Sequence, residues 1–316
     1  MSRLARPKIL VIGELNVDIV ATGLRSAPLM GAEILAETCE LTLGSASAIF
    51  AAGMAKLGHA VTFFSQVGRD QFGDFCLRAL KESGVSTRHV TRKAEETTGV
   101  TIALSGKRDR ALVTYAGAVA TLTADSIDET VLSRHDHLHL TSYYLQTALR
   151  PSFPRLLRQA KASGLTTSFD PNSDPHDKWN RNIDSVLKFT DVLFVNEREA
   201  KRLTRSNTLN GALKTLGAKV NCAVVKRGAR GATAIQDEKI FNHSGFKISA
   251  VDTTGAGDSF AAGFMSAYLR KATVAECLRV GNACGALSTM SIGGTAGQPT
   301  DEKIHKFFQA NPENSK

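Results

Sequence analysis

The sequence is poor in aromatic residues, which make up 6% of the chain and include one Trp. Proteins that bind single-stranded nucleic acid stack the bases on aromatic side chains, so this composition argues against such a function. The net charge of +9 comes without a dense basic cluster, because the richest stretch, residues 107–110, is short and contains an acid. We expect this stretch to be a solvated turn and expect no nucleic-acid partner.

The sequence also lacks long apolar runs and any motif of closely spaced cysteines. The five cysteines have irregular spacing and form no Cys-x-x-Cys motif; they are Cys39, Cys76, Cys222, Cys277 and Cys284. This pattern predicts buried, reduced thiols, and it argues against a disulfide framework or a zinc site. No apolar run reaches the about 18 residues of a transmembrane helix. We therefore expect no membrane association, no signal peptide and a cytoplasmic location.

Apolar runs typical of strands alternate with helical patterns through most of the 316 residues. The patterns predict strands at 8–13, 59–67, 137–141, 165–169, 192–195 and 220–225, and helices at 45–57, 71–83, 151–163, 259–270 and 273–290. Such alternation indicates right-handed crossovers and a mainly parallel, Rossmann-like sheet between two layers of helices, an α/β three-layer sandwich. No linker interrupts the pattern, so we expect one domain over residues 1–316.

Two segments break this alternation. Residues 98–104 and 111–115 are typical of a hairpin around the charged turn, and residues 17–43 lack a helical period. We expect the segments at about 17–43 and 98–116 to form a small β lid outside the main sheet. A lid over a reaction site excludes water, which would otherwise compete with the substrate.

The glycine-rich run at residues 252–260 carries the strongest chemical signal. Gly255, Ala256 and Gly257 precede a helical pattern that begins at Asp258. Unpaired N–H groups at a helix start attract anions, and small residues let a phosphate approach them. An Asp beside such an anion hole suits a general base that takes a proton from an attacking hydroxyl. The alternative, from these residues alone, is a tight turn with Asp258 as a helix cap.

The sequence of this run, Asp-Thr-Thr-Gly-Ala-Gly-Asp-Ser-Phe, resembles the C-terminal signature of the ribokinase/PfkB family of carbohydrate kinases. Further segments similar to the family follow in order at residues 44–58, 67–73, 196–199 and 226–231. The resemblance implies a ribokinase-like fold and an enzyme that uses ATP and Mg²⁺ to phosphorylate a hydroxyl of a small sugar. It also implies a homodimer formed through the lid.

The resemblance assigns roles at the phosphate end of the site. It makes Asp258 the catalytic base and the stretch 255–257 the anion hole for the transferred phosphate. Asn196 and Glu199 would organise Mg²⁺ and the phosphates, with Glu199 reaching the metal through water. The alternative for Glu199 is an exposed acid on a helix.

The resemblance also assigns nucleotide and cation contacts. The residues expected to line the nucleotide are Lys226, Gly228, Gly231 and Asn282. Asp252 and the carbonyl of Thr254 resemble two ligands of a K⁺ site that part of the family has. The remaining ligands of that site would come from residues 288–297.

Polar side chains near strand ends are candidates for holding the substrate. Asn16 and Asp18 follow the first strand two residues apart, so their side chains point the same way. An amide beside a carboxylate suits two neighbouring hydroxyls, and the family commonly holds its sugar with an Asp here. Ligands of parallel sheets bind beyond the carboxyl ends of the strands. Further candidates for substrate contact are Gly44, Ser45, Thr141, Ser142 and Asp170.

One position departs from the family pattern. The N-terminal signature usually starts with two glycines and has an Asn five residues after the first. Here Ser45 replaces the second glycine and Ile49 stands at the Asn position. A branched alkyl group removes polar recognition, so a nucleoside kinase on the same fold is one alternative. A non-catalytic sugar- or nucleotide-binding regulatory protein is the other.

Three histidines, His135, His137 and His139, alternate along one predicted strand face. The spacing fits either a metal site or a buried strand. No acid or Cys cluster completes a metal site, so we expect a buried strand.

Overall fold

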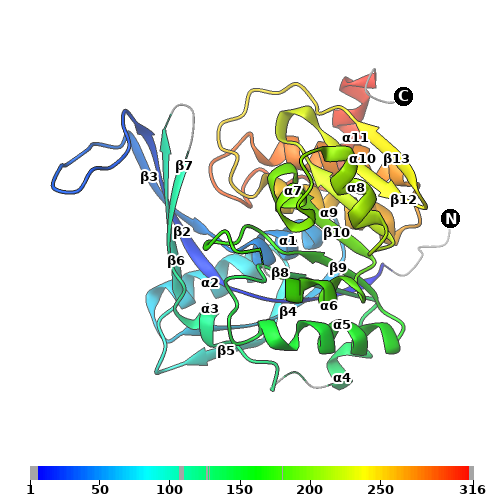
Figure 1. Cartoon of the computed structure of the whole chain (residues 1–316). Helices are drawn as coiled ribbons and strands as arrows, with labels where there is room; N and C mark the ends of the chain where they lie inside the picture. Colours follow the sequence, from blue (N-terminus) through cyan, green and yellow to red (C-terminus); the bar gives the residue numbers. More distant parts are fainter. Residues whose placement is uncertain (1–5, 107–109, 126, 128, 180, 313–316) are drawn as a thin grey trace.

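The main sheet has nine strands in the computed structural model, which describes residues 6–106, 110–125, 127, 129–179 and 181–312. In spatial order they are β13 (Lys239–His243), β12 (Ala232–Gln236), β11 (Cys222–Lys226), β10 (Val192–Asn196), β9 (Thr166–Asp170), β8 (His137–Thr141), β1 (Lys8–Ile12), β4 (Ala60–Gly68) and β5 (Ser86–Lys93). Neighbours from β11 to β5 pair in parallel, and β12 and β13 add an antiparallel edge. The mainly parallel sheet predicted from the sequence is confirmed (Figure 1).

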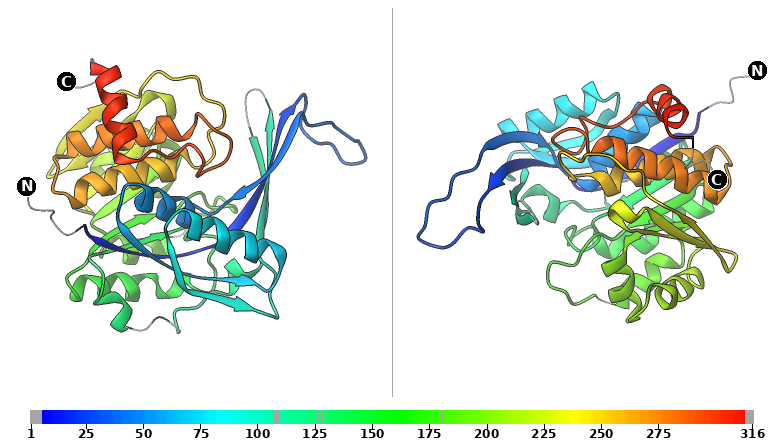
Figure 2. Two further views of the ribbon diagram at one scale, coloured as in Figure 1. Left: turned by 180° about the vertical axis from the view of Figure 1, so that it is seen from behind. Right: turned by 90° about the horizontal axis from the view of Figure 1, so that it is seen from above.

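Helices cover both faces of this sheet, as the alternating pattern predicts. One face packs against α1 (Ala46–Lys56), α2 (Gln71–Glu82), α9 (Ala256–Leu269) and α10 (Val274–Ser288). The other packs against α5 (Phe153–Ala162), α6 (Asp184–Leu187), α7 (Glu197–Thr204) and α8 (Leu209–Gly217). Figure 2 shows the first group from behind. The shorter or peripheral elements are α3 (Ala118–Thr121), α4 (Glu129–Leu132), α11 (Asp301–Ala310), η1 (Arg150–Ser152), η2 (Arg181–Ile183) and η3 (Gly228–Arg230).

A second, four-stranded sheet stands beside this body (Figure 1). Its order is β3 (Thr38–Leu43), β2 (Asn16–Leu24), β6 (Gly99–Gly106) and β7 (Arg110–Tyr115). The predicted hairpin forms β6 and β7 and lies outside the main sheet, as expected. The centre of its turn, residues 107–109, lies outside the described residues, as do 1–5 and 313–316 at the termini. We refer to this four-stranded sheet as the lid.

The central strand β8 carries two histidines in a fully buried environment. His137 Nδ1 lies 2.8 Å from Thr166 Oγ1, and His139 Nδ1 lies 2.6 Å from Ser168 Oγ. Burial lowers the pKa of His137 to about 3, so its ring is neutral. Within the described ranges, no three His, Cys, Asp or Glu residues gather as a metal would need. These histidines are hydrogen-bonded core residues.

The sequence analysis did not predict several of the observed helices and strands. The edge strand β5 has the polar sequence Ser-Thr-Arg-His-Val-Thr-Arg-Lys, because it pairs on one side only and is largely exposed. The hairpin of β12 and β13 and the helix α11 were also not predicted. Helix α9 begins at Ala256, three residues before the predicted start, because its first turn is built from glycine and alanine.

The structure shows which cysteines are exposed and whether any helix could span a membrane. Four of the cysteines are buried and Cys39 is exposed, so the prediction of buried thiols is wrong for Cys39, which lies on the lid strand β3. All five are free. Within the described ranges, no helix is long and apolar enough to cross a membrane.

Candidate active site

A cavity of 870 Å³ lies between the lid and the carboxyl ends of the parallel strands. The predicted site residues that line it are Asn16, Asp18, Ser45, Ile49, Ser142, Asn196, Glu199, Lys226, Gly228, Gly231, Thr254, Gly255, Ala256, Gly257, Asp258 and Asn282. The predicted residues outside its lining are Gly44, Thr141, Asp170 and Asp252. Residues from far apart in the sequence therefore meet here, as expected for the carboxyl edge of a parallel sheet.

The start of α9 forms one wall of the cavity. Gly255 is the N-cap residue with φ 68°, in the left-handed region that favours glycine. A Cβ at Gly255 would lie 2.7 Å from the Cα of Gly294 and 3.0 Å from Ile49 Cδ1, so no larger residue fits. Asp258 is the third residue of the helix and not its cap, which excludes the simple capping alternative. The N–H of Ala256 donates to the carbonyl of Thr253 at 3.3 Å. The first turn of α9 still presents the positive end of the helix dipole to the cavity, which attracts anions.

The Asn-x-x-Glu segment forms the start of α7. Asn196 Oδ1 accepts the N–H of Glu199 at 2.9 Å, and Glu199 Oε2 accepts the N–H of Asn196 at 2.8 Å. This reciprocal capping box fixes both side chains. Glu199 Oε1 also accepts the hydroxyl of Ser173 at 3.0 Å. Glu199 is 4% exposed, so the alternative of an exposed helix acid is wrong.

A buried lysine lies among the carboxylates of the cavity. Lys226 Nζ lies 2.5 Å from Asp170 Oδ2, and a Cβ built at Gly257 would be 3.2 Å from the same ammonium. Burial lowers the pKa of Lys226, but the carboxylates of Asp170, Asp258 and Glu199 outweigh it and raise that pKa to about 12. The ammonium is therefore charged and lies next to the start of α9.

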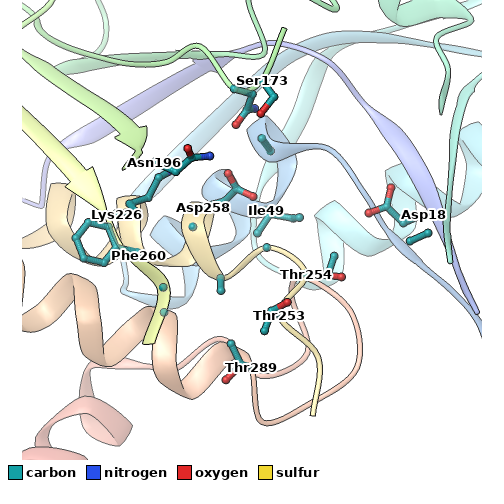
Figure 3. A pocket seen from close by; sticks show the side chains of 18 of the residues that line it. Asp18, Ile49, Ser173, Asn196, Lys226, Thr253, Thr254, Asp258, Phe260 and Thr289 are labelled. Carbon is teal, nitrogen blue, oxygen red and sulfur yellow. The ribbon is translucent and has the colours of Figure 1, made fainter. Parts of the chain in front are cut away.

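The same carboxylates affect Glu199. Burial and then the neighbouring Asp170 carboxylate raise the pKa of Glu199, against the opposing effect of Lys226. Figure 3 shows Asn196 and Lys226 on one side of Asp258, with Ile49 and then Asp18 on the other. Asp258 thus lies between the ammonium of Lys226 and Asp18 on the lid strand β2.

Asn16 and Asp18 both belong to the lid strand β2 and line the cavity together. Asn16 Nδ2 donates to Asp18 Oδ1 at 3.0 Å, so the spacing of two does place the side chains on one face. A Cβ at Gly44 would be 2.1 Å from Asp18 Oδ1, which explains why a glycine stands behind this pair. Asn16 Nδ2 also lies 3.3 Å from Thr101 Oγ1 on β6.

Glu14 is a cavity residue that the sequence analysis missed. It is 3% exposed, and its carboxylate accepts the hydroxyls of Ser47 at 2.6 Å, Ser142 at 2.8 Å and Thr141 at 3.0 Å. Thr141 is thus a partner of Glu14 behind the cavity wall. An acid directly after a buried apolar strand was the signal available in the sequence, because an uncompensated charge there would be costly.

The far end of the cavity is more apolar and lies beside α10. Phe246, Ile248, Gly285 and Ala286 line it together with Asn282. Asn282 Nδ2 lies 3.2 Å from His243 Nδ1 and donates to the carbonyl of Leu278 at 2.9 Å, which holds the amide in place. Such a combination of apolar surface and one fixed amide suits a planar heterocycle.

Asp252 ties two loops together behind the start of α9. Its Oδ1 accepts the N–H of Thr254 at 2.9 Å and the hydroxyl of Thr254 at 2.8 Å, and its Oδ2 accepts the N–H of Gly293 at 2.8 Å. The predicted segments 252–254 and 288–297 are therefore neighbours, as a shared cation site would require.

Comparisons with known proteins agree with this arrangement. A family model described as pfkB family carbohydrate kinase matches residues 6–301. The chain is 32% identical over 268 residues to an ATP-dependent ribose-1-phosphate kinase of Halopiger xanaduensis, covering 84% of this chain and 86% of the relative. It is 31% identical over 285 residues to a 2-dehydro-3-deoxygluconokinase of Bacillus subtilis, covering 85% and 87%.

A solved structure is similar over nearly the full length. A protein of E. coli assigned as ribokinase II, in complex with ATP and Mg²⁺, superposes with a TM-score of 0.85 at 26% identity. The match covers 96% of this chain and 100% of that chain.

Proposed function

The chain belongs to the pfkB family of carbohydrate kinases and is an ATP-dependent sugar kinase, and we propose that it transfers the γ-phosphate of ATP to a hydroxyl of an uncharged sugar, with Asp258 as the general base. The observation that carries this proposal is the position of Asp258 in the first turn of α9, directly after the anion hole of Gly255 to Gly257. A carboxylate there meets the acceptor hydroxyl at the point where the phosphate arrives.

Phosphoryl transfer depends on positioning and on charge stabilisation. The first-turn N–H groups of α9 and the ammonium of Lys226 face the same part of the cavity and would hold the γ-phosphate. Asp258 accepts the proton of the attacking hydroxyl, which raises the nucleophilicity of its oxygen. The lid excludes water as a competing acceptor.

The residues around Asn196 fit a nucleotide-bound Mg²⁺. Glu199 supplies a buried carboxylate and Asn196 supplies an amide at the cavity wall, whereas Asp170, outside the lining, holds Lys226. Mg²⁺ usually keeps several waters and binds through one or two carboxylates and the substrate phosphates. When bound, the metal neutralises charge on the β- and γ-phosphates. The capping box holds Asn196 and Glu199 in place for this role.

The adenine is assigned to the far end of the cavity. There Phe246 and Ile248 provide apolar surface, and Asn282 provides a fixed amide. Gly228 and Gly231, both with positive φ, bring the chain after β11 close to the nucleotide. ATP therefore spans the cavity from Asn282 to the anion hole.

An uncharged acceptor suits the electrostatics of the lid end. Glu14 and Asp18 line this end, and the cavity-lining Lys and Arg residues of the described part are Lys226 and Lys247 alone. Lys226 is engaged at the phosphate end, and Lys247 lies beside Phe246. An anionic sugar would meet the two carboxylates of Glu14 and Asp18, and like charges repel. The relatives named above act on a phosphorylated sugar and a sugar acid, so substrate choice is where this chain is expected to differ.

A nucleoside is the second candidate acceptor. Leu112, Tyr115, Val119 and Leu145 add apolar surface to the lid end of the cavity. Together with Ile49 this surface suits a base or another apolar substituent on the sugar. Asn16 and Asp18 would hold the ribose hydroxyls in either case.

The experiment is a panel of acceptors assayed for ADP release with Mg-ATP. Ribose, fructose and adenosine test the neutral class, and ribose 1-phosphate and 2-dehydro-3-deoxygluconate test the anionic class. We expect kcat/KM to be highest for a neutral sugar or nucleoside. An anionic acceptor with the highest kcat/KM would overturn the substrate class and leave the kinase assignment intact.

We also propose a K⁺ site at Asp252 and the carbonyl of Thr254. The hydrogen bonds of Asp252 to Thr254 and Gly293 support it, because they bring both loops to one place beside the anion hole. Replacing K⁺ by a large organic cation in the assay should lower kcat. An unchanged kcat would argue that Asp252 only joins the loops.

A lid-mediated homodimer is supported by an apolar stripe across the lid. Leu41 and Ile102 are register partners of Ile19, and Val113 is the partner of Ile102. Leu41, Ile102 and Val113 are 42%, 39% and 59% exposed. Light scattering should give the dimer mass, and Ile102→Glu should give the monomer mass. A monomeric parent protein would overturn this proposal.

A further inference from the structure

A second cavity, of 530 Å³, lies outside the lining of the active site. We call it the Arg150 pocket; its lining residues are Tyr144, Arg150, Asp174, His176, Lys178, Trp179 and Arg205. They come from the turn after β8, from η1, from the loop after β9 and from the end of α7. No residue of this set has a role in the proposed reaction.

The pocket carries an excess of positive charge. Arg150, Lys178 and Arg205 converge on it from three segments, and no carboxylate of the described residues forms an ion pair with any of them. The one carboxylate in the lining, Asp174, accepts the backbone N–H groups of His176, Lys178 and Trp179 at 2.7 to 2.9 Å. The guanidinium of Arg150 lies over the ring of Tyr143, 5.7 Å from its centroid, a contact that leaves its charge uncompensated. Three cations without a carboxylate partner, against one carboxylate, suit an anion with about two negative charges.

A further carboxylate on the same loop, that of Asp177, is already engaged. Asp177 lies 2.8 Å from Arg202 and 3.6 Å from Arg198, both residues of α7. It also accepts the indole N–H of Trp179 at 2.5 Å. The cations of the Arg150 pocket are therefore left for an external anion. Two guanidinium groups suit a phosphate, because each presents a planar fork of donors to its oxygens.

An aromatic wall stands beside these cations. The rings of Tyr144 and Trp179 meet edge to face with centroids 5.6 Å apart, and the two residues are 6% and 9% exposed. The hydroxyl of Tyr144 is buried, and no described group forms a hydrogen bond with it. An unsatisfied hydroxyl costs free energy that a small shift toward a polar ligand would recover. Aromatic surface next to cations suits a ring that carries the phosphate.

The loop after β9 connects the Arg150 pocket to the active site. Asn172 and Ser173 line the active-site cavity, whereas the next residue, Asp174, lines the Arg150 pocket. Asn172 Nδ2 donates to Ser142 Oγ at 2.8 Å, and the hydroxyl of Ser173 donates to Glu199. A ligand that fixes Asp174 therefore also fixes two contacts of the active site.

Helix α7 makes a second connection. Asn196 and Glu199 form its first turn in the active site, and Arg205 caps its far end in the Arg150 pocket. A rigid helix that is held at both ends transmits a displacement from one site to the other. Binding free energy at the Arg150 pocket would then be coupled to the active site.

We propose that the Arg150 pocket binds a phosphate monoester carried on a ring, a sugar phosphate or a nucleoside monophosphate, and that its occupancy changes the kinase activity through residues 172–174 and α7. The binding part stands on the pocket alone, and the coupling part rests on the proposed kinase function. A physiological ligand of this class would be a product of phosphoryl transfer to a sugar or nucleoside.

The single Trp of the chain makes the binding part directly measurable. Because Trp179 forms a wall of the pocket, ligand binding should change its fluorescence. The titrations use ribose 5-phosphate, AMP and inorganic phosphate, each with a saturating non-hydrolysable ATP analogue and Mg²⁺ in the active site. We expect saturable quenching by at least one monoester. Titration calorimetry on the same samples gives the stoichiometry, which should be one ligand per chain.

Matched variants separate this pocket from the active site. Arg150→Gln with Arg205→Gln removes two of the three cations and should weaken monoester binding at least tenfold. Arg158→Gln, on the exposed face of α5, removes one positive charge elsewhere and is the control for each single variant, Arg150→Gln and Arg205→Gln; it should leave binding unchanged. All variants should keep the basal kcat. In the parent protein, the bound monoester should shift kcat or the KM for the acceptor at least twofold, and the double variant should lose this shift.

Three results would overturn the proposal. One is an absence of both quenching and heat with every monoester, and another is full binding by the Arg150→Gln, Arg205→Gln variant, which would place the ligand in the active site. Equal affinity for inorganic phosphate and the esters would overturn recognition of the ring. Because binding is read without turnover, a protein that binds the monoester but phosphorylates no acceptor would refute the kinase proposal and not the pocket.

Discussion

Lys226 Nζ lies 2.5 Å from Asp170 Oδ2, and this largely buried ion pair joins the carboxyl ends of β11 and β9. The side chains of Lys226 and Asp170 are 14% and 1% exposed. Their residues are 56 positions apart in the sequence and end the strands β11 and β9. The pair thus holds a charged ammonium beside Gly257, where the transferred phosphate is expected.

Lys226→Met should lower kcat about 100- to 1000-fold, the usual loss when one charge-stabilising donor is removed. It should also destabilise the fold by about 3–5 kcal/mol, because the buried Asp170 loses its partner. The double variant Lys226→Met, Asp170→Asn removes the uncompensated charge and should regain stability without regaining turnover. Steady-state kinetics and denaturant unfolding check both parts. A double variant with full turnover would show that the ammonium does not act on the phosphate.

Asp258→Asn should lower kcat about 100- to 10,000-fold, because an amide cannot take the proton of the acceptor hydroxyl. The side chain keeps its size and its place in the first turn of α9, so binding of Mg-ATP should stay within about twofold of the parent. ATP affinity by calorimetry and ADP release by a coupled assay separate the two effects. Undiminished turnover would refute Asp258 as the base.

Gly255→Ala should abolish activity, because a Cβ there collides with the Cα of Gly294 at 2.7 Å and φ is 68°. Gly164→Ala is the matched control: its φ is +83° and a Cβ would meet nothing within 4 Å. The control should lose only about 1 kcal/mol of stability from backbone strain and keep kcat. Equal kinetics for the two variants would contradict the close fit at the anion hole.

Ile49→Asn should shift the ratio of kcat/KM towards polyhydroxylated acceptors, because it adds a polar group to the cavity wall beside Gly255. Since Ile49 is 3% exposed, an unsatisfied amide there should cost about 1–3 kcal/mol of stability. Ile49→Val keeps the apolar surface and should leave the substrate order unchanged. If Ile49→Asn gives the parent's acceptor profile, residue 49 does not set selectivity.

Glu199→Gln should change how stability depends on pH. Burial raises the pKa of Glu199 in the folded protein above its unfolded value of about 4.3. Between those two pKa values the folded state holds the extra proton, so the contribution of Glu199 to stability falls as pH rises. Gln still offers an oxygen to the N–H of Asn196, so the capping box is kept.

The Glu199→Gln variant should therefore gain stability relative to the parent as pH rises above about 4.3, the unfolded pKa of Glu. Its kcat should fall, because the carboxylate near the metal is lost. Urea unfolding at a series of pH values gives the first difference, and the Mg²⁺ dependence of kcat gives the second. A stability difference that does not vary with pH would contradict the raised pKa.

The phosphate end of the site was readable from the sequence because it is local. Residues 255–258 follow one another at a helix start, so local spacing predicts the anion hole. The resemblance to the family singled out Asn196 and Glu199, which occupy one helical turn. The role of glycine at position 255 also follows from local backbone geometry. The lid hairpin was predictable for the same reason, since its two strands are adjacent in the chain.

Groups that depend on distant partners were missed. Glu14 is tolerated in the interior because Ser47, Thr141 and Ser142 donate to it, and two of those partners lie more than 120 residues away. The edge strand β5 has no apolar pattern because one of its sides has no neighbouring strand. Hydrophobic periodicity reflects which side chains are buried, so it does not predict a strand that is largely exposed.

The sequence by itself determined the alternating α/β architecture and predicted an anion hole at residues 255–257, because hydrophobic period and glycine at a helix start act over a few residues. Only the tertiary structure decided which charges meet. It paired Lys226 with Asp170, placed Glu14 and Asp18 at the lid end of the cavity, and brought three cations without a carboxylate partner together at the Arg150 pocket. Electrostatic interactions depend on the distance between charges in space, and the separation of two residues along the sequence does not give that distance.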